Sequence, residues 1–138
     1  MSTIHLEIIT AEGVALSEDV EMVLAPGTEG QLGILPRHAP LLTGLQAGEL
    51  CYRKDGQLVS MVITGGFMEV VPTRVTVLAD AAERADEIDI ARAEAARQRA
   101  LSRMDDKSDT VDAGRARVAL LRATVRLKVA RKRRSSQG

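Results

Sequence analysis

GTEGQLGILPRHAPLLTGLQAGEL, residues 27–50, is the stretch that decides the fold. Its five glycines give the backbone freedom to turn, and its prolines, with Pro26 just before them, forbid a helix across it. Leucine and isoleucine come between the turns in short bursts, so we predict very short strands that fold back over a small core. The polar side chains left in this segment must then face outward, and they are candidates for contact with a partner: Glu29, Gln31, Arg37 and His38.

Alternating apolar and polar residues before this segment predict two more strands. Residues 3–10 alternate, which puts His5 on the outer face of the first strand. Residues 14–25 read as a second strand, with Met22 and Leu24 on the inner side.

Residues 49–80 predict an antiparallel hairpin followed by two further strands. Asp55-Gly56 suits the hairpin turn, and Gly65-Gly66 is expected to end the second strand of that hairpin. Residues 67–71 and 74–79 alternate again. Eight or more short strands in about eighty residues predict a small all-β sandwich or flattened barrel.

Charge divides the chain in two, although the formal net charge is zero. Residues 1–80 carry four Lys/Arg against ten Asp/Glu, and residues 81–138 carry fifteen against nine. No acidic residue follows Asp112, so the end of the chain is strongly basic. A solubilising basic tail is the plain alternative to a binding surface here.

Beyond Asp80 the sequence changes to strong helix formers. Asp86 or Asp89 can cap a helix over residues 88–104, and Asp109 or Thr110 can cap a second over residues 111–131, followed by a frayed tail. The short break between them predicts an antiparallel helical hairpin, and the chain is therefore α+β.

Each predicted helix carries a stripe of arginines at helical spacing. The stripes are Arg92, Arg99 and Arg103 in the first helix, and Arg115, Arg122, Arg126 and Arg133 in the second. The second helix also has two apolar flanks, of which packing on the first helix covers only one. The other flank would lie on the β domain, on another protein, or on each in turn; a helix simply docked on the sandwich is the alternative.

Groups that could perform chemistry are sparse. His5 and His38 are the only imidazoles, they have no metal-ligand spacing, and no phosphate-binding loop motif occurs. Cys51 is expected to pack rather than react. We therefore predict no catalytic residue, no metal and no required cofactor. With no signal peptide and no long apolar run, we expect a cytosolic protein that reaches a membrane only through partners.

Four motifs in the same order resemble the epsilon subunit of bacterial rotary (F-type) ATP synthases: EGQLGILPRHAPLLT at 29–43, TGGFMEV at 64–70, VTVLAD at 75–80 and AERADEID at 82–89. The resemblance covers essentially the whole chain. It implies a sandwich of about ten strands over residues 1–84 that binds the gamma subunit and the ring of c subunits, and a regulatory helical hairpin over residues 85–138. It also implies a non-catalytic place in the central rotor stalk, on the cytoplasmic face of the cell membrane, where proton-driven rotation is coupled to ATP synthesis.

The resemblance also assigns roles to residues. Glu29, Gln31 and His38 would meet gamma and the c ring. The hairpin, when extended, would block ATP hydrolysis by inserting into the catalytic head of alpha and beta subunits. There Arg115, Arg122 and Arg126 would face an acidic segment of the beta subunits.

Some epsilon subunits bind ATP through an I/L-D-x-x-R-A motif, and this chain has IDIARA at residues 88–93. By the resemblance, the nucleotide would be surrounded by Glu83, Ile88, Asp89, Arg92, Ala93, Arg99, Arg122 and Arg126. ATP would then be a regulatory ligand that holds the hairpin away from the head. The alternative is that Asp89 only caps the helix and pairs with Arg92.

Two other interpretations remain open at this point. The basic helices could belong to a nucleic-acid-binding module, although the acidic first half and the near absence of aromatic residues argue against it. The hairpin could also be purely structural within the same family.

Overall fold

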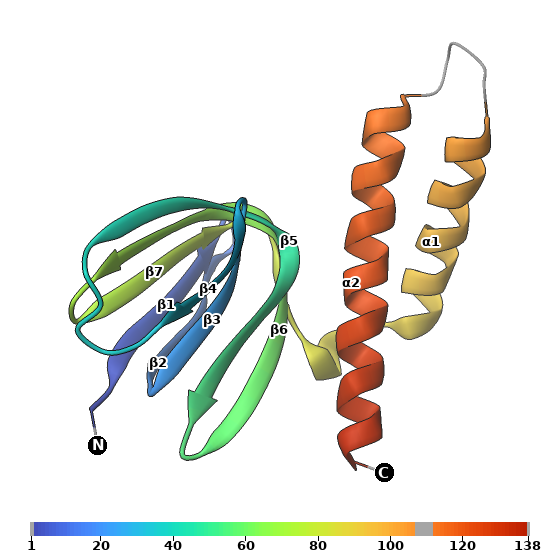
Figure 1. Cartoon of the computed structure of the whole chain (residues 1–138). Coiled ribbons are helices and arrows are strands. Elements are labelled where there is room, and N and C mark those ends of the chain that lie inside the picture. The colour runs from blue at the N-terminus through green and yellow to red at the C-terminus, as the bar shows by residue number, and fades with distance from the viewer. Residues whose placement is uncertain (1, 107–111, 138) are drawn as a thin grey trace. The chain divides into compact units, whose positions relative to one another are not determined.

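The computed structural model describes residues 2–106 and 112–137, with side chains described as far as Lys132. The chain divides into two compact units, Met1–Arg84 and Ala85–Gly138 (Figure 1). Within the described residues, no helix is both long and apolar enough to cross a bilayer.

The first unit is a single eight-stranded sheet that curls on itself into a sandwich (Figure 1). The strands are β1 (Ile4–Thr10), β2 (Gly13–Val20), β3 (Met22–Gly27), β4 (Gly30–Ile34), β5 (Leu41–Lys54), β6 (Gln57–Val71), β7 (Arg74–Ala79) and β8 (Ala82–Arg84). Their order is β2-β1-β7-β6-β5-β3-β4, and β8 pairs with β6. The predicted β-sandwich is confirmed, with eight strands in the described residues rather than about ten.

The core is built from alternate residues of the strands, as the periodicity predicted. In β1, Ile4, Leu6 and Ile8 are almost fully buried. His5 lies on the outer face, where its Nδ1 donates to Asp19 at 2.8 Å and its Nε2 is hydrogen-bonded to the Ser17 hydroxyl at 3.0 Å. The Cys51 side chain is packed, as expected, 3.3 Å from the Ser60 hydroxyl.

The strand predicted over residues 14–25 is wrong, because the chain breaks at Glu21. The Glu21 amide donates to the Arg53 carbonyl at 2.8 Å, which takes the chain from its pairing with β1 to a new pairing with β5. The break also reverses the faces: Val23 and Ala25 are buried, whereas Met22 and Leu24, predicted to face inward, are only partly buried.

The predicted end of a strand at Gly65-Gly66 is also wrong, because β6 runs through both glycines. The register of β6 against β5 is the same on both sides of them. Both glycines have positive φ, 120° and 139°, and the bend is bridged by hydrogen bonds from Asp80 to Gly65 and from Thr64 to Ala81. The glycines therefore bend one long strand and do not terminate it.

The second unit holds a short 3-10 turn, η1 (Ala85–Glu87), and two helices, α1 (Ile90–Asp105) and α2 (Ala113–Gln137). Asp89 caps α1, one of the two caps predicted: its Oδ1 accepts from the Arg92 amide at 3.0 Å. Asp112 makes the same bond to the Arg115 amide at 3.1 Å. The predicted caps Asp109 and Thr110 lie outside the described residues.

The second helix is longer than predicted and continues to Gln137 rather than ending at residue 131. The sequence after Gly114 contains no glycine or proline before Gly138, so nothing in the chain stops the helix earlier.

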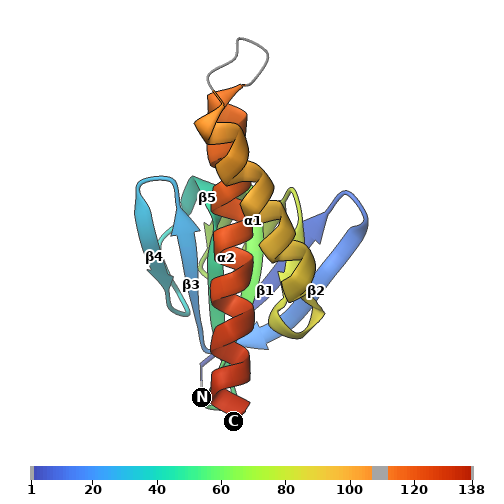
Figure 2. The same cartoon turned by 90° about the vertical axis from the view of Figure 1, so that its right-hand side faces the viewer.

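The two helices pack side by side as the predicted antiparallel hairpin (Figures 1 and 2). Small residues make up most of the contact, which lets the backbones approach closely. The buried side chains in line with it are Ala93 and Ala100 in α1, and Ala116, Ala123, Leu127 and Ala130 in α2. On the other apolar flank of α2, Val118 and Leu121 are 46% and 43% exposed.

Candidate functional site

The polar residues of the fold-deciding segment lie at both ends of β4. Glu29 and Gln31 are exposed at the turn from β3 into β4, whereas His38 follows the far end of β4. The His38 Nδ1 donates to the Ala39 carbonyl at 2.7 Å. Arg37, in a left-handed conformation with φ 66°, donates its amide to the Pro72 carbonyl at 2.9 Å. The structure therefore places the predicted contact residues at the two ends of the five-residue strand β4.

An exposed apolar row crosses the outer face of the sheet, and sequence reasoning missed it. Phe67 in β6 is paired with Leu78 in β7, Leu78 with Ile9 in β1, and Ile9 with Val14 in β2. We call Val14, Ile9, Leu78 and Phe67 the apolar row. Phe67, Leu78 and Val14 are 62%, 53% and 63% exposed. Exposed apolar residues that adjoin one another mark an interaction surface.

The signal for this row is present in the sequence but is ambiguous. Phe67 and Leu78 sit at outward positions of strands whose inward positions are also apolar, so alternation alone cannot single them out. Only the pairing of β6 with β7, and of β7 with β1, brings them into one line. Leu42, 72% exposed, extends the patch on β5.

The perturbed titrating groups of the sandwich do not point to catalysis. Burial raises the pKa of Tyr52, and the nearby Glu18 carboxylate raises it further. The hydrogen bond that the Lys54 ammonium donates to the Glu18 carboxylate raises the pKa of Lys54. Both shifts keep the tyrosine neutral and the lysine charged around neutral pH, so neither group is poised to transfer a proton there.

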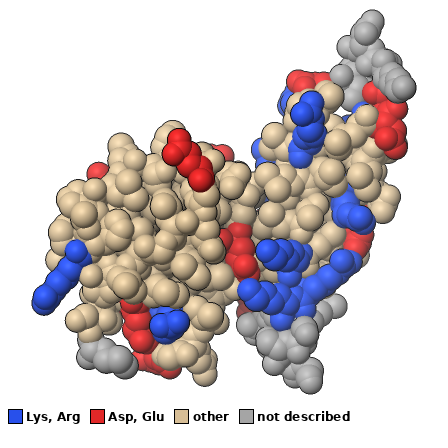
Figure 3. Space-filling view, viewed as in Figure 1, with Lys and Arg blue, Asp and Glu red and all other residues tan. Residues whose placement is uncertain are grey.

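The arginine stripes of α1 and α2 lie on one side of the hairpin, which we call the arginine face. In each helix the stripe lies roughly 90° around the axis from the alanines that face the other helix. Antiparallel packing turns both stripes to the same side, and Arg103 of α1 and Arg122 of α2 indeed line one hollow. Figure 3 shows Lys and Arg side chains gathered over the helices.

On the opposite side of the hairpin, arginines form ion pairs with a carboxylate. Glu94 bonds to Arg131 across the two helices and lies 3.7 Å from Arg97 on its own helix. No acidic residue occurs within α2. The positive charge of the hairpin is therefore compensated on the Glu94 side and concentrated on the arginine face.

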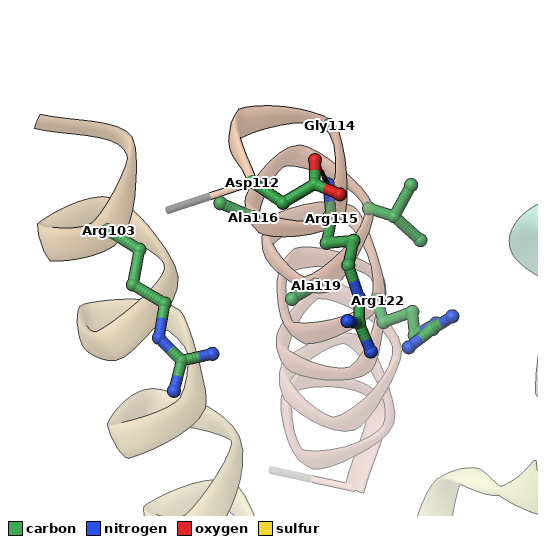
Figure 4. Close-up of a pocket in the computed structure, with 8 residues that line it drawn as sticks. Arg103, Asp112, Gly114, Arg115, Ala116, Ala119 and Arg122 are labelled. Carbon is green, nitrogen blue, oxygen red and sulfur yellow. Dashed lines mark hydrogen bonds between the residues drawn. The ribbon is translucent and has the colours of Figure 1, made fainter. Parts of the chain in front are cut away.

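The arginine face is hollowed at the turn end of the hairpin, where α1 ends and α2 begins (Figure 4). The hollow has a volume of about 1020 Å³. Arg103 reaches into it from α1, and Arg115 and Arg122 extend from α2 (Figure 4). The carboxylate at its rim, Asp112, uses Oδ1 to cap α2.

The residues predicted to bind a nucleotide lie in different parts of the structure. Asp89, Arg92 and the buried Ala93 form the start of α1, with Ile88, also buried, just before them. Arg99 follows on the arginine face, and Arg122 lies on that face of α2, as does Arg126 by its helical spacing. Glu83 belongs to β8, in the other unit. The Asp89 carboxylate is already a helix cap, which agrees with its structural interpretation.

Comparison with known proteins covers both units. A family model described as the beta-sandwich domain of the ATP synthase delta/epsilon chain matches residues 3–85. A second model, described as the long alpha-helix domain of the same chain, matches residues 86–131.

Curated relatives match at high identity. The chain is 62% identical over 134 residues to the ATP synthase epsilon chain of Herpetosiphon aurantiacus, covering 97% of this chain and 98% of that one. It is 54% identical over 135 residues to the ATP synthase epsilon chain of Dehalococcoides mccartyi strain BAV1, covering 97% and 96%.

The fold also matches a solved structure. A chain in the cryo-EM structure of Euglena gracilis mitochondrial ATP synthase superposes with a TM-score of 0.73 at 20% identity, over 100% of this chain and 83% of that one. At that identity the match supports the fold alone.

Proposed function

Since the chain belongs to the ATP synthase delta/epsilon family as a non-catalytic epsilon subunit, we propose that it works in the central rotor stalk, coupling proton-driven rotation to ATP synthesis and restraining ATP hydrolysis. The proposal places it at the cytoplasmic face of the cell membrane, held there by its partners. The family assignment decides against the nucleic-acid-binding alternative.

The observation that carries the stalk role is the apolar row. A subunit that transmits torque must hold its neighbour firmly, and buried aromatic and aliphatic side chains supply most of the energy of such contacts. Phe67 is the only phenylalanine of the chain, and more than half of it is exposed. We assign the apolar row to the gamma subunit.

Replacing Phe67 with serine should weaken binding of the gamma subunit about tenfold or more, because an aromatic anchor at an interface contributes roughly 1.4 kcal/mol or more. The measurement is calorimetric titration of the whole chain with purified gamma. Leu58→Ser is the matched control: Leu58 is 59% exposed on the same strand but outside the row. Equal losses for both variants would remove the row from the interface.

The two ends of β4 suggest two partners. Glu29 and Gln31 lie at one end of this five-residue strand, and His38 follows its other end. We propose that the gamma subunit and the c ring divide these ends between them.

The arginine face supports the inhibitory role of the hairpin. Arg115, Arg122 and Arg126 recur along one helix that contains no acidic residue, and this arrangement suits an acidic segment of the catalytic beta subunits. Each exposed ion pair is worth only about 0 to 1 kcal/mol, so inhibition would depend on several of them together.

We further propose that ATP binds the compact hairpin through the residues around Asp89, Arg92, Arg99 and Arg126. Isothermal titration of the whole chain with ATP should show saturable heat, and Arg92→Gln should abolish it, because arginine forks supply the charge-assisted bonds to phosphate. Arg97→Gln, on the other side of α1, should change little. No saturation at millimolar ATP would leave Asp89 as a helix cap only.

A further inference from the structure

We propose that the hollow at the turn end of the hairpin is a binding site for a phosphate-class oxyanion, held by Arg103, Arg115 and Arg122. This hollow is distant from the start of α1, where the nucleotide residues begin, because Arg92 and Arg103 are eleven residues apart, or about 16 Å along the helix. Within the described part of the chain, Arg122 is the one residue that the hollow shares with the candidate nucleotide residues. The inference does not depend on ATP binding to the Asp89 motif.

The hollow is lined mainly by positive charge. Three arginines from two helices line one concave surface, and among the described residues that line it only Asp112 carries a carboxylate. Among the residues that the structure describes, no ion pair neutralises Arg103, Arg115 or Arg122. Like charges held together in this way repel one another, and a bound anion relieves the repulsion.

The hollow also has room for a small anion. The floor of the hollow is made by small residues, Gly114, Ala116 and Ala119, which leave room beneath the long arginine side chains. Guanidinium groups present fixed pairs of N–H donors that match the oxygens of a phosphate group, whereas lysine would supply only a point charge. Figure 4 shows Arg103 extending from α1 toward α2, and Arg115 and Arg122 extending from α2.

The ligand chemistry is therefore that of a small, multiply charged phosphate, either free phosphate or pyrophosphate or the phosphate tail of a nucleotide. No aromatic side chain lines the hollow, so nothing there would stack on a base. Because the ligand contacts both helices, occupancy would also favour the packing of α1 against α2.

The test is a titration of the ¹⁵N-labelled whole chain with pyrophosphate at constant ionic strength, followed by the amide shifts of residues 103, 115 and 122. We expect saturable shifts and at least a tenfold weaker affinity in Arg103→Gln/Arg115→Gln. The matched control is Arg97→Gln/Arg117→Gln, which removes the same charge from the same two helices at positions outside the hollow. It should change the affinity less than twofold.

Two results would overturn the site. One is a set of amide shifts that does not saturate with pyrophosphate. The other is an equal loss of pyrophosphate affinity in both double variants, because binding would then depend on net charge alone. Adding ATP to the pyrophosphate-saturated chain then identifies the source of the phosphate. Displacement of pyrophosphate means that the site takes the nucleotide's phosphate tail. Amide shifts at residues 89–93 with pyrophosphate still bound mean that the hollow takes free phosphate. Both results support a phosphate site. An absence of ATP binding would sink only the nucleotide proposal.

Discussion

Replacing Gly66 with alanine should destabilise the sandwich by about 4 kcal/mol or more, a large part of the roughly 5 to 15 kcal/mol that stabilises an ordinary domain. Gly66 has φ 139°, a conformation that costs a residue with a side chain about 1 to 3 kcal/mol. A Cβ at this position would also lie 2.0 Å from the Leu78 carbonyl oxygen and 3.0 Å from the Ala79 Cα. Those atoms are backbone of the paired strand β7, so they cannot move aside without breaking the ladder.

Gly30→Ala is the control that separates the clash from the backbone strain. Gly30 has a similar φ of 133°, but nothing lies within 4 Å of where its Cβ would stand. Gly30→Ala should therefore destabilise the sandwich only by the cost of the backbone conformation, about 1 to 3 kcal/mol. Urea unfolding of the two variants measures the difference. Equal destabilisation would show that the close approach to Leu78 contributes nothing.

The sequence predicts the class of fold because local pattern and global structure agree for most of the chain. Alternation in residues 3–10 and 74–79 identifies the core side of β1 and β7, and the helix formers beyond Asp80 identify the hairpin. The Asp89 cap follows from the preference of that position for a short acceptor side chain.

The errors come from features that depend on long-range pairing. The break at Glu21 exists because its amide bonds to Arg53, thirty-two residues away, and no local signal announces that bond. Gly65-Gly66 reads as a terminator because glycine usually ends strands, yet here the backbone of β7 comes close to Gly66 and the strand continues. Local propensity cannot distinguish these two uses of glycine.

The same limit applies to the functional surfaces. Helical periodicity predicts both arginine stripes, because each stripe is local to one helix. The apolar row and the hollow are not local: the row joins residues of four strands, and the hollow joins two helices across the turn. They became visible only when the pairing and the packing were known.

Removing residues 88–138 should raise ATP hydrolysis by the assembled catalytic head about tenfold. Three exposed ion pairs, at Arg115, Arg122 and Arg126, of roughly 0.5 kcal/mol each would favour the inhibited state by about 1.5 kcal/mol, on the order of a factor of ten. In the full-length chain, Arg115→Gln/Arg122→Gln should raise the rate part of the way. Arg97→Gln/Arg117→Gln, with the same loss of charge away from the hollow, should leave it unchanged.

The hydrolysis rate of the reconstituted complex, with the full chain and with the chain that lacks residues 88–138, tests the central claim most directly. The truncated chain retains the apolar row and should remain bound, which co-purification with gamma confirms before the rate is read. The account predicts a rate about tenfold higher with the truncated chain bound. An unchanged rate with the truncated chain still in the complex would contradict it and leave the hairpin a purely structural element.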